Sequence, residues 1–473
     1  MLSVSSEGAA SGGPALVRRL GALDGALITI GAMLGSGIFL TTGDIARRLP
    51  QGGLILLLWV AGGLVTLAGA LSYAELGAMF PLAGGQYHFL KEAYGRLWGF
   101  LFGWTSFFVI MSGGIAAIAV GFGEYLGSFV PFFSTQHVLA HARIGSWAWS
   151  VSGGQLAGVL AIVFHTAVNY VGLREGAFVQ NAVTALKLAA LLSLAVVGLV
   201  VPSTASLELL APLPSSGLAA GVALGMVAAL WTYDGWYVLT FSAGEIRAPG
   251  KNLPRGLVVG SLVVIALYLA INIVYLRALP VTEIGRSPRI AEAAARALFG
   301  MNGARAISLC VLLATFGCLA SNVLCCSRIY LPMAQDGLFF RSLARVNPRT
   351  HTPSTSLLAQ GIWASLLAVS GTYEQLYTCV VFAGVMFQAA SGLAVLVLRR
   401  TRPLVPRPYR AWGYPWVPAV FVLACLALVW STLVQSPRES LVGLLLIASG
   451  LPVYAWWNKK SAAPPAAVVT NEG

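Results

Sequence analysis

GAMLGSGIFL, residues 31–40, places three glycines and a serine inside an otherwise apolar run. Such a run is unexpected in lipid, because glycine weakens a helix and no water reaches a backbone that a break exposes. Helix packing through a GxxxG pair accounts for Gly31 and Gly35, and Gly31 is free to serve both roles. It does not account for Ser36 and Gly37, since residues two apart point to different faces of a helix. The stretch therefore predicts a locally unwound backbone.

The composition places this run in a membrane protein. Of the 473 residues, 58% are hydrophobic and only 10% are charged, and the mean hydropathy is +0.80. Soluble proteins carry about 25% charged residues. Scanning for apolar stretches of about 20 residues predicts twelve spanning helices, which put both chain termini on one side of the membrane. Their approximate limits are residues 21–46, 52–80, 95–130, 151–173, 177–201, 217–244, 254–279, 303–334, 356–371, 375–398, 416–434 and 440–457.

The basic residues indicate which side the termini occupy. With the N-terminus inside, most of the 29 lysines and arginines fall in cytoplasmic segments, as the positive-inside rule requires. The sequence therefore predicts cytoplasmic tails at residues 1–20 and 458–473. Because topology accounts for the net charge of +13, and no extramembrane segment is long enough to form a nucleic-acid site, no nucleic-acid partner is expected.

The sixth predicted span contains a second anomaly. In ALWTYDGWYVLTFSAGE, residues 229–245, Asp234 and Gly235 interrupt an apolar segment. A carboxylate inside a span costs about 2.5–3.5 kcal/mol. Asp234 is therefore expected either to order an irregular turn beside Gly235 or to contact the amine of a ligand. The sequence leaves both roles open, and in either case the sixth helix is predicted to be broken.

Breaks in spans 1 and 6 are typical of a five-plus-five inverted repeat, with a substrate site where the two repeats meet. An unwound turn exposes N–H groups at the start of one half-helix, where anions bind. It also exposes carbonyl oxygens at the end of the other half-helix, which suit a cation. A site that offers both recognises a zwitterion, and an α-amino acid is the simplest such ligand.

The fifth predicted span contains a lysine, Lys187, in VQNAVTALKLAALLSLAVVGLV. At 1.5 Å per residue it lies roughly 14 Å into the span, close to the midplane of the bilayer, a depth that disfavours snorkelling to the interface. Two roles remain open. The amine is either a proton carrier with a lowered pKa, or an ammonium that permanently occupies a cation site.

Other functional classes receive little support. The six cysteines all lie in predicted spans, with neither the spacing of a metal site nor a place on an outer loop for a disulfide. His137 and His141 share an outer loop without an acidic third ligand, and the other histidines are scattered. We therefore expect no metal, no cofactor and no catalytic cluster of a membrane-embedded enzyme. A channel is a further alternative, but two broken helices that meet at the midplane favour an occluded site.

The chain resembles the amino acid–polyamine–organocation superfamily, and within it the L-type amino acid transporter branch. The matching motifs are GAMLGSGIF, GALSYAELGAMFPLAGGQYHFLKEAYG, NYVGLREGAFVQNAVTALKLAAL, YDGWYVLTFSAGEIRAPGKNLPRG and SRIYLPMAQDGLF. The resemblance implies an all-α, LeuT-type fold. Spans 1–5 (residues 21–201) and spans 6–10 (residues 217–398) would form the two inverted repeats, and spans 11–12 (residues 416–457) would be peripheral.

The resemblance also implies a set of substrate-binding residues. The backbone of Gly35, Ser36 and Gly37, with Met33 just before it, would hold the substrate carboxylate, and carbonyls of both breaks would hold the amino group. The aromatic gate would be Trp231, followed by three further predicted binding residues, Thr232, Tyr233 and Asp234. Apart from the resemblance, two acidic residues near the inner loops, Glu75 and Glu245, are expected to gate the site or order those loops, the alternative being solvated charges at the membrane interface.

The family's lysine in span 5 matches Lys187, whose ammonium would stand where sodium-coupled relatives hold sodium. Its neighbours would be the region of Gly31 and either Ser321 or Asn322 of span 8. The loop at residues 131–150 lacks the cysteine that heteromeric members use, so no disulfide-linked heavy chain is expected.

Together these features predict a transporter of neutral L-amino acids in the inner membrane of a bacterium. It would work by alternating access, without sodium, as an exchanger or a proton-coupled carrier. Asp234 keeps a cationic amino acid or a polyamine open as the substrate.

Overall fold

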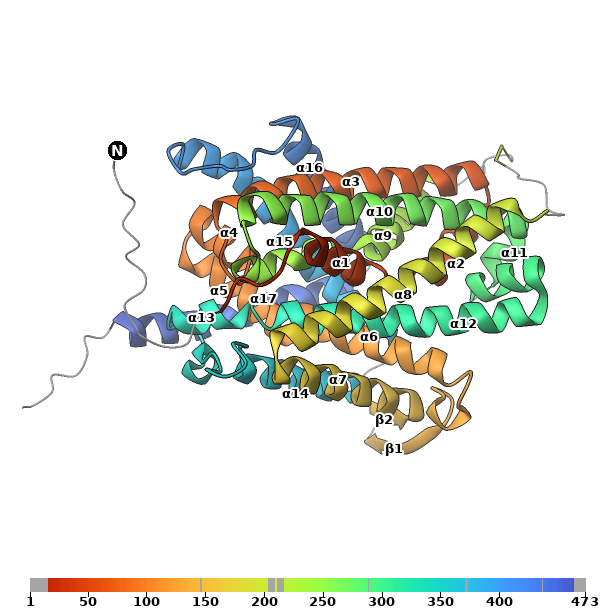
Figure 1. Ribbon diagram of the computed structural model, residues 1–473, viewed down its shortest axis with the longest axis horizontal. Coiled ribbons are helices and arrows are strands. Elements are labelled where there is room, and N and C mark those ends of the chain that lie inside the picture. The colour runs from red at the N-terminus through yellow and green to blue at the C-terminus, as the bar shows by residue number, and fades with distance from the viewer. Residues whose placement is uncertain are drawn as a thin grey trace, which may run out of the picture.

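The apolar stretches of the sequence form long helices that lie roughly along one axis (Figure 1). The computed structural model describes residues 16–144, 147–202, 209–210, 217–287, 289–370, 373–435 and 437–462. The outer parts of both predicted tails therefore lie outside the described residues.

We name the end of the bundle where α17 ends, at the left in Figure 1, the termini end, and the opposite end the far end. The elements are α1 (Ala22–Met33), η1 (Gly37–Phe39), α2 (Thr41–Arg48), α3 (Gly52–Met79), α4 (Gln86–Tyr94), α5 (Arg96–Thr105), the π-helical turn η2 (Ser106–Ile110), α6 (Met111–Leu126), η3 (Pro131–Phe133), β1 (Val138–Ile144), β2 (Trp147–Ser152), α7 (Gly153–Val171), α8 (Leu173–Val200), α9 (Leu218–Tyr233), η4 (Val238–Glu245), α10 (Pro249–Ala278), α11 (Val281–Arg286), α12 (Ile290–Cys326), α13 (Tyr330–Gln335), η5 (Arg341–Ala344), α14 (Ser354–Ser370), α15 (Tyr373–Thr401), α16 (Trp416–Gln435) and α17 (Pro437–Ala462).

The predicted spans correspond to helices in the structure. Ten described segments are long and apolar enough to cross a membrane, and two shorter apolar helices, α1 and α14, fall where spans 1 and 9 are predicted. The main differences are at the ends of elements. Helix α12 starts at Ile290, thirteen residues before the predicted limit, but it is kinked at Gly300, whose φ of 68° is not helical, so its spanning part begins just after Gly300 and close to the predicted residue 303. The loop predicted at residues 131–150 contains the antiparallel β1–β2 hairpin.

The first spanning segment is broken where the glycines cluster. Helix α1 ends at Met33, the backbone at Leu34 leaves the helical region (φ −75°, ψ 77°), and helical structure resumes at Gly37. Because glycine and serine resist unwinding less than alanine or leucine, the break falls at the GSG sequence. The first predicted discontinuity is confirmed.

The sixth spanning segment is broken at the aspartate and glycine. Helix α9 ends at Tyr233, Asp234 is extended (φ −59°, ψ 159°), and Gly235 has φ 97°. A positive φ of that size strains any residue that carries a Cβ atom, so glycine is required at this position. The chain continues as the tight helix η4, which confirms the second discontinuity.

The two halves of the chain are arranged with opposite polarity. After its break, the first segment continues as α2 toward the far end, whereas the sixth continues as η4 to the termini end, where Glu245 meets the residues before α1. The second span of each half is followed by a short helix, which is α4 at the termini end and α11 at the far end (Figure 1). This is the five-plus-five inverted repeat of the LeuT-type fold.

Candidate functional site

The two breaks face one cavity of about 630 Å³, which is open on one side. Its walls come from α1 and η1, the end of α9, α6, α12 and α15. The residues that line it are Ala32, Met33, Gly35, Ser36, Gly37, Ile110, Met111, Gly114, Ile118, Trp231, Thr232, Asp234, Gly235, Tyr237, Cys318, Asn322 and Val380. Seven of the eight predicted substrate-binding residues are therefore brought together around one space, from positions about 200 residues apart in the sequence.

Tyr233 is the predicted binding residue that does not line the cavity. Its hydroxyl donates to the carbonyl of Trp59 on α3 at 3.0 Å, and its ring packs edge-on against the Trp59 ring. Successive residues in a helix point about 100° apart, so when Trp231 and Thr232 face the cavity, Tyr233 is turned toward α3. This placement corrects the prediction that Tyr233 contacts the substrate.

The two breaks touch each other directly. A Cβ atom on Gly235 would lie 2.7 Å from the carbonyl oxygen of Ala32, and a Cβ atom on Gly37 would lie 2.8 Å from the side chain of Thr232. Glycine is therefore needed at Gly235 because the backbone of the first break leaves no room for a side chain, and at Gly37 because the branched side chain of Thr232 fills the space. The geometry of one break depends on the other.

Tyr268 of α10 joins the two breaks, a role that the sequence did not predict. Its hydroxyl donates to the carbonyl of Met33 at 2.7 Å, and the carbonyl of Thr232 lies within reach at 3.3 Å. Each carbonyl belongs to the last turn of a half-helix, where no backbone donor is available within the helix. The residue is a single tyrosine in an apolar span, and nothing in the sequence around it marks this role.

We expect Tyr268→Phe to reduce transport by about tenfold, because it removes a buried hydrogen bond worth about 1 kcal/mol and leaves the Met33 carbonyl unsatisfied. The measurement is the initial rate of amino acid uptake into proteoliposomes. Tyr275→Phe is the matched control, since Tyr275 is also buried on α10 and its hydroxyl has no hydrogen-bond partner among the described residues. Equal losses in both variants would contradict a specific role for Tyr268.

Lys187 of α8 is fully buried and reaches the first break. Its Nζ atom donates to the carbonyls of Gly31 at 2.8 Å and Leu34 at 2.9 Å, and to that of Ala314 on α12 at 3.3 Å. Three carbonyl oxygens saturate the three donors of an ammonium group. The amine therefore holds the end of α1 and the unwound residue after it against α8 and α12.

The partner of Lys187 on α12 differs from the prediction. Ser321 and Asn322 lie seven and eight residues beyond Ala314, which is about 10–12 Å along a helix, and among the described residues no hydrogen bond joins either of them to Lys187. A Cβ atom on Gly317, one turn before Ser321, would lie 3.3 Å from the lysine Nζ atom. Ser321 instead lies against Gly31, where an added Cβ atom would be 2.3 Å from its Oγ atom. Asn322 donates to the carbonyl of Cys318 at 2.9 Å and lines the cavity.

Asp234 lies between the cavity and a second, mostly apolar space of about 710 Å³ bounded by α3, α9, α15 and α16. Gln388 of α15 donates to one carboxylate oxygen at 2.9 Å, and the hydroxyl of Tyr237 lies 3.3 Å from the other. Both partners are neutral, so the negative charge is fixed in place without being neutralised. Trp231 lines both spaces and stands between them.

The termini end of the site is closed by a buried ion pair and by backbone hydrogen bonds. Arg328 donates to both carboxylate oxygens of Glu245, at 2.8 and 3.1 Å, and both side chains are almost fully buried. The carbonyl of Glu245 accepts from the N–H groups of Arg19 and Leu20, and Arg247 N–H donates to the carbonyl of Leu20. Toward the far end, the cavity follows α6 as far as Ile118, which is partly exposed.

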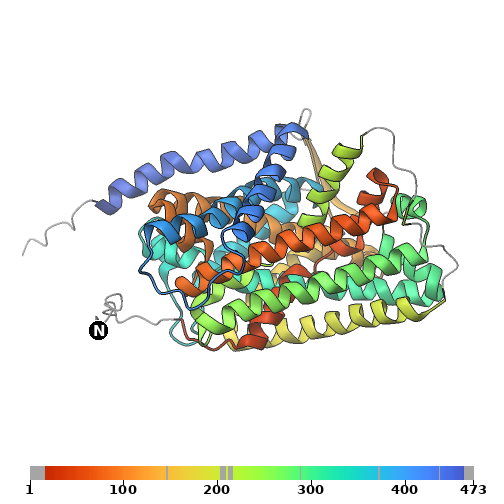
Figure 2. The same ribbon diagram turned by 90° about the horizontal axis from the view of Figure 1, so that it is seen from above.

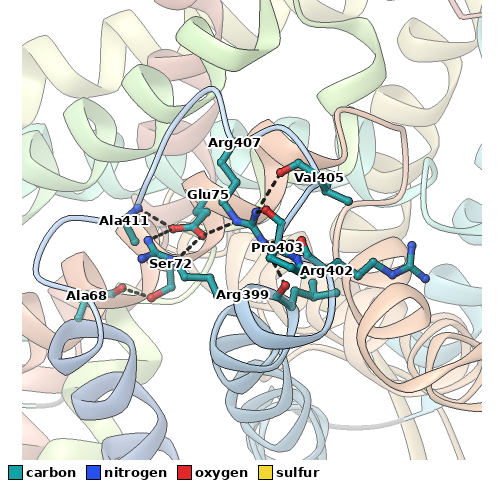
Figure 3. A network of polar contacts seen from close by, with 10 residues as sticks. Ala68, Ser72, Glu75, Arg399, Arg402, Pro403, Val405, Arg407 and Ala411 are labelled. Carbon is teal, nitrogen blue, oxygen red and sulfur yellow. Dashed lines mark hydrogen bonds and ion pairs between the residues drawn. The ribbon is translucent and has the colours of Figure 1, made fainter. Parts of the chain in front are cut away.

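Glu75 orders the loop between α15 and α16 at the same end of the bundle. Arg399 donates to both of its carboxylate oxygens, at 2.8 and 2.6 Å, and the N–H of Ala411 donates at 2.7 Å (Figure 3). Arg407 lies 3.6 Å away and bonds carbonyls of the loop itself. Glu75 is nearly fully buried and forms its ion pair with Arg399. These contacts fit a role in ordering the loop and give no support to a role as a gate.

The sequence matches known transporters over nearly its whole length. The family model described as amino acid permease matches residues 20–453. The chain belongs to the amino acid permease family. Over 451 residues it is 30% identical to the serine/threonine exchanger SteT of Bacillus subtilis (strain 168), covering 95% of this chain and 98% of that protein.

Two human relatives are equally similar to this amino acid permease. It is 30% identical over 443 residues to b(0,+)-type amino acid transporter 1, covering 93% of this chain and 88% of the relative. It is 30% identical over 464 residues to large neutral amino acids transporter small subunit 2, covering 96% and 83%. Because the family and these relatives are transporters, the alternative of a membrane-embedded enzyme is wrong, and the superfamily inferred from the motifs is confirmed.

Proposed function

We propose that this permease exchanges neutral L-amino acids across the inner membrane of a bacterium, without sodium, by alternating access. The observation that supports this most directly is the cavity between the breaks of spans 1 and 6. Two of the relatives described above are named for serine and threonine and for large neutral amino acids. The termini lie in the cytoplasm in this proposal, as the distribution of basic residues predicts.

The breaks offer complementary backbone ends to a zwitterion. The residues that begin the second half-helix, Ser36 and Gly37, line the cavity at the positive end of that half-helix, which suits a carboxylate. The carbonyl of Ala32, a lining residue near the end of α1 that neither Lys187 nor Tyr268 engages, suits the α-ammonium group. Trp231 stands beside them, in position to close over a bound substrate.

Lys187 supports a sodium-independent mechanism. Its ammonium group already bonds the carbonyls of Gly31 and Leu34, so a second cation at that place would meet both charge repulsion and occupied acceptors. We assign Lys187 as a fixed cation that holds the break, in place of the proton carrier that the sequence left open. Exchange then needs no coupling ion, because each half-cycle carries an amino acid.

The decisive experiment is uptake of labelled amino acids by proteoliposomes, loaded or empty, with and without an imposed pH gradient. We expect uptake of serine, threonine or a large neutral amino acid that requires amino acid inside and is insensitive to sodium and to the pH gradient. Uptake into empty vesicles that is driven by an inward proton gradient would show that the mechanism is proton symport and would contradict the proposed exchange. If no amino acid or polyamine is carried under any condition, the proposed function fails.

A cationic amino acid is the second candidate, and Asp234 is the reason. The carboxylate lines the cavity, and its described partners, Gln388 and Tyr237, are neutral. It could therefore pair with a cationic side chain at the cost of little rearrangement. Competition of labelled threonine uptake by lysine or arginine tests this candidate, and loss of that competition in Asp234→Asn would locate the contact.

The chain is proposed to work without a disulfide-linked heavy chain. The loop between α6 and α7, which carries the β1–β2 hairpin, contains no cysteine. Transport by the purified chain alone in proteoliposomes supports this proposal, and a requirement for a second protein would contradict it.

A further inference from the structure

A third cavity, separate from the substrate site and from the apolar space beside Asp234, opens at the termini end beside the start of α8. It has a volume of about 1050 Å³ and is lined by Arg19, Leu20, Asp24, Leu173, Arg174, Ala177, Phe178, Asn181 and Arg247. Its three arginines come from three places in the chain, which are the segment before α1, the start of α8 and the junction of η4 with α10.

The positive charge of this cavity is only partly offset by its lining, which holds three arginines and one carboxylate, that of Asp24. None of the three guanidinium groups of Arg19, Arg174 and Arg247 has an ion pair or hydrogen bond to another described residue. The one acidic residue in the lining, Asp24, is engaged by neutral donors, which are the Gly21 N–H at 2.7 Å and the Asn181 side chain at 2.6 Å. Arginine forks match the geometry of phosphate oxygens and bind them in pairs, so the cavity suits a phosphate-type anion.

The position of the cavity favours the headgroup of a phospholipid as the source of that anion. Helix α8 runs along the outer edge of the bundle, with α1 beside its termini end (Figure 2). Its outward face is apolar and exposed from Phe178, which is 72% exposed, to Val200. The acyl chains of a lipid could therefore lie along α8 while its phosphate reaches the arginines, as anionic headgroups do at basic residues beside spanning helices.

Two of the arginines belong to the closure of the substrate site. Arg19 N–H donates to the Glu245 carbonyl at 2.8 Å, and Arg247 N–H donates to the Leu20 carbonyl at 2.8 Å. The three arginines line one cavity while these two segments are paired, and Arg19 and Arg247 are carried by opposite partners of the pairing. An anion bound among them would therefore favour the arrangement that is closed at the termini end.

We propose that Arg19, Arg174 and Arg247 form a binding site for a phosphate-type anion, supplied by an anionic phospholipid, that stabilises the state closed at the termini end. The site lies outside the substrate cavity, and its binding tests require no transported substrate. If the transport assay fails, the lipid-retention and hydrogen-exchange tests still decide whether this anion site exists.

Lipid retention by the full-length protein is the first test. Protein from nanodiscs of phosphatidylcholine with phosphatidylglycerol is released in native mass spectrometry, and bound lipids are counted. We expect wild-type protein to retain phosphatidylglycerol preferentially and Arg174→Gln or Arg247→Gln to weaken that retention by about fivefold each. The control Arg345→Gln removes the same charge from an exposed position that is not part of the cavity. Equal retention in wild type and both cavity variants would overturn the proposal.

Hydrogen exchange separates the two sources of the anion and tests the link to closure. Amides of residues 17–22 and 243–248 are expected to exchange several-fold more slowly in phosphatidylglycerol than in phosphatidylcholine, and this difference is expected to be smaller in the two variants. Inorganic phosphate is added to phosphatidylcholine nanodiscs as a separate arm. Protection by inorganic phosphate but not by phosphatidylglycerol would show that the site binds an anion, and that this anion is soluble and does not come from a lipid. If neither phosphatidylglycerol nor phosphate protects these amides, the proposed stabilisation is wrong.

Discussion

Replacing Lys187 with methionine is expected to reduce amino acid exchange by about 100-fold, while the protein still inserts and purifies as a folded species. Methionine has a similar length but no donor, so the carbonyls of Gly31 and Leu34 lose their buried partner. Each unsatisfied buried carbonyl costs about 1–3 kcal/mol, and the break relaxes to avoid that cost. Since the substrate is proposed to bind backbone groups of the same break, a displaced backbone lowers both substrate affinity and the rate of exchange.

The control for this variant is Lys251→Met, which removes one lysine from an exposed position at the start of α10. Uptake rates and size-exclusion profiles of the two variants are compared in the same lipid. Lys251→Met is expected to transport like wild type. Transport by Lys187→Met at the wild-type rate would remove the assigned role of the lysine, and a pH dependence that disappears only in this variant would restore it as a proton carrier.

The backbone breaks could be predicted because they depend on local sequence. Glycine next to serine at residues 35–37, and aspartate next to glycine at residues 234–235, are poor helix formers in segments otherwise rich in helix formers. Their meeting at one site followed from the repeat, which relates span 1 to span 6. The depth of Lys187 was also a local quantity, obtained by counting residues along one helix.

The partners across helices could not be predicted from the sequence. The contact of Lys187 with Ala314, two turns from Ser321 and Asn322, depends on how α8 slides against α12. Tyr268 and Gln388 are single polar residues on apolar helices, and only packing shows that they reach the breaks. The ion pair of Glu245 with Arg328 joins residues far apart in sequence. The sequence could mark Glu245 as an unusual charge, but it could not identify Arg328 as its partner.

Tyr233 shows the limit of carrying a motif residue by residue. The motif marks a helix end, and four consecutive residues there cannot all face one cavity. A rotation of about 100° per residue directs one of them elsewhere. The break at Asp234 then turns the chain so that Asp234 returns to the cavity while Tyr233 packs on Trp59.

Substitution of Gly235 by alanine is expected to be about as damaging as Lys187→Met, with transport reduced by roughly 100-fold. Two independent costs combine at this position. The backbone has φ 97°, a region that costs a residue with a Cβ atom about 1–3 kcal/mol. The new methyl group would also lie 2.7 Å from the Ala32 carbonyl, which pushes the two breaks apart where they touch.

Gly114→Ala is the matched control for Gly235→Ala, because both glycines line the same cavity. Gly114 lies within α6, and a Cβ atom there would meet no heavy atom within 4 Å. Alanine also favours a helix by about 1 kcal/mol over glycine, so this variant should be at least as stable as wild type and should transport a small amino acid normally. Parallel loss of transport in both variants would mean that any added methyl group in the cavity blocks the substrate. Loss confined to Gly235→Ala would show that transport requires the close contact of the two breaks. Both variants add one methyl group at a glycine of the same cavity, so they differ only in the backbone conformation and contacts of that glycine.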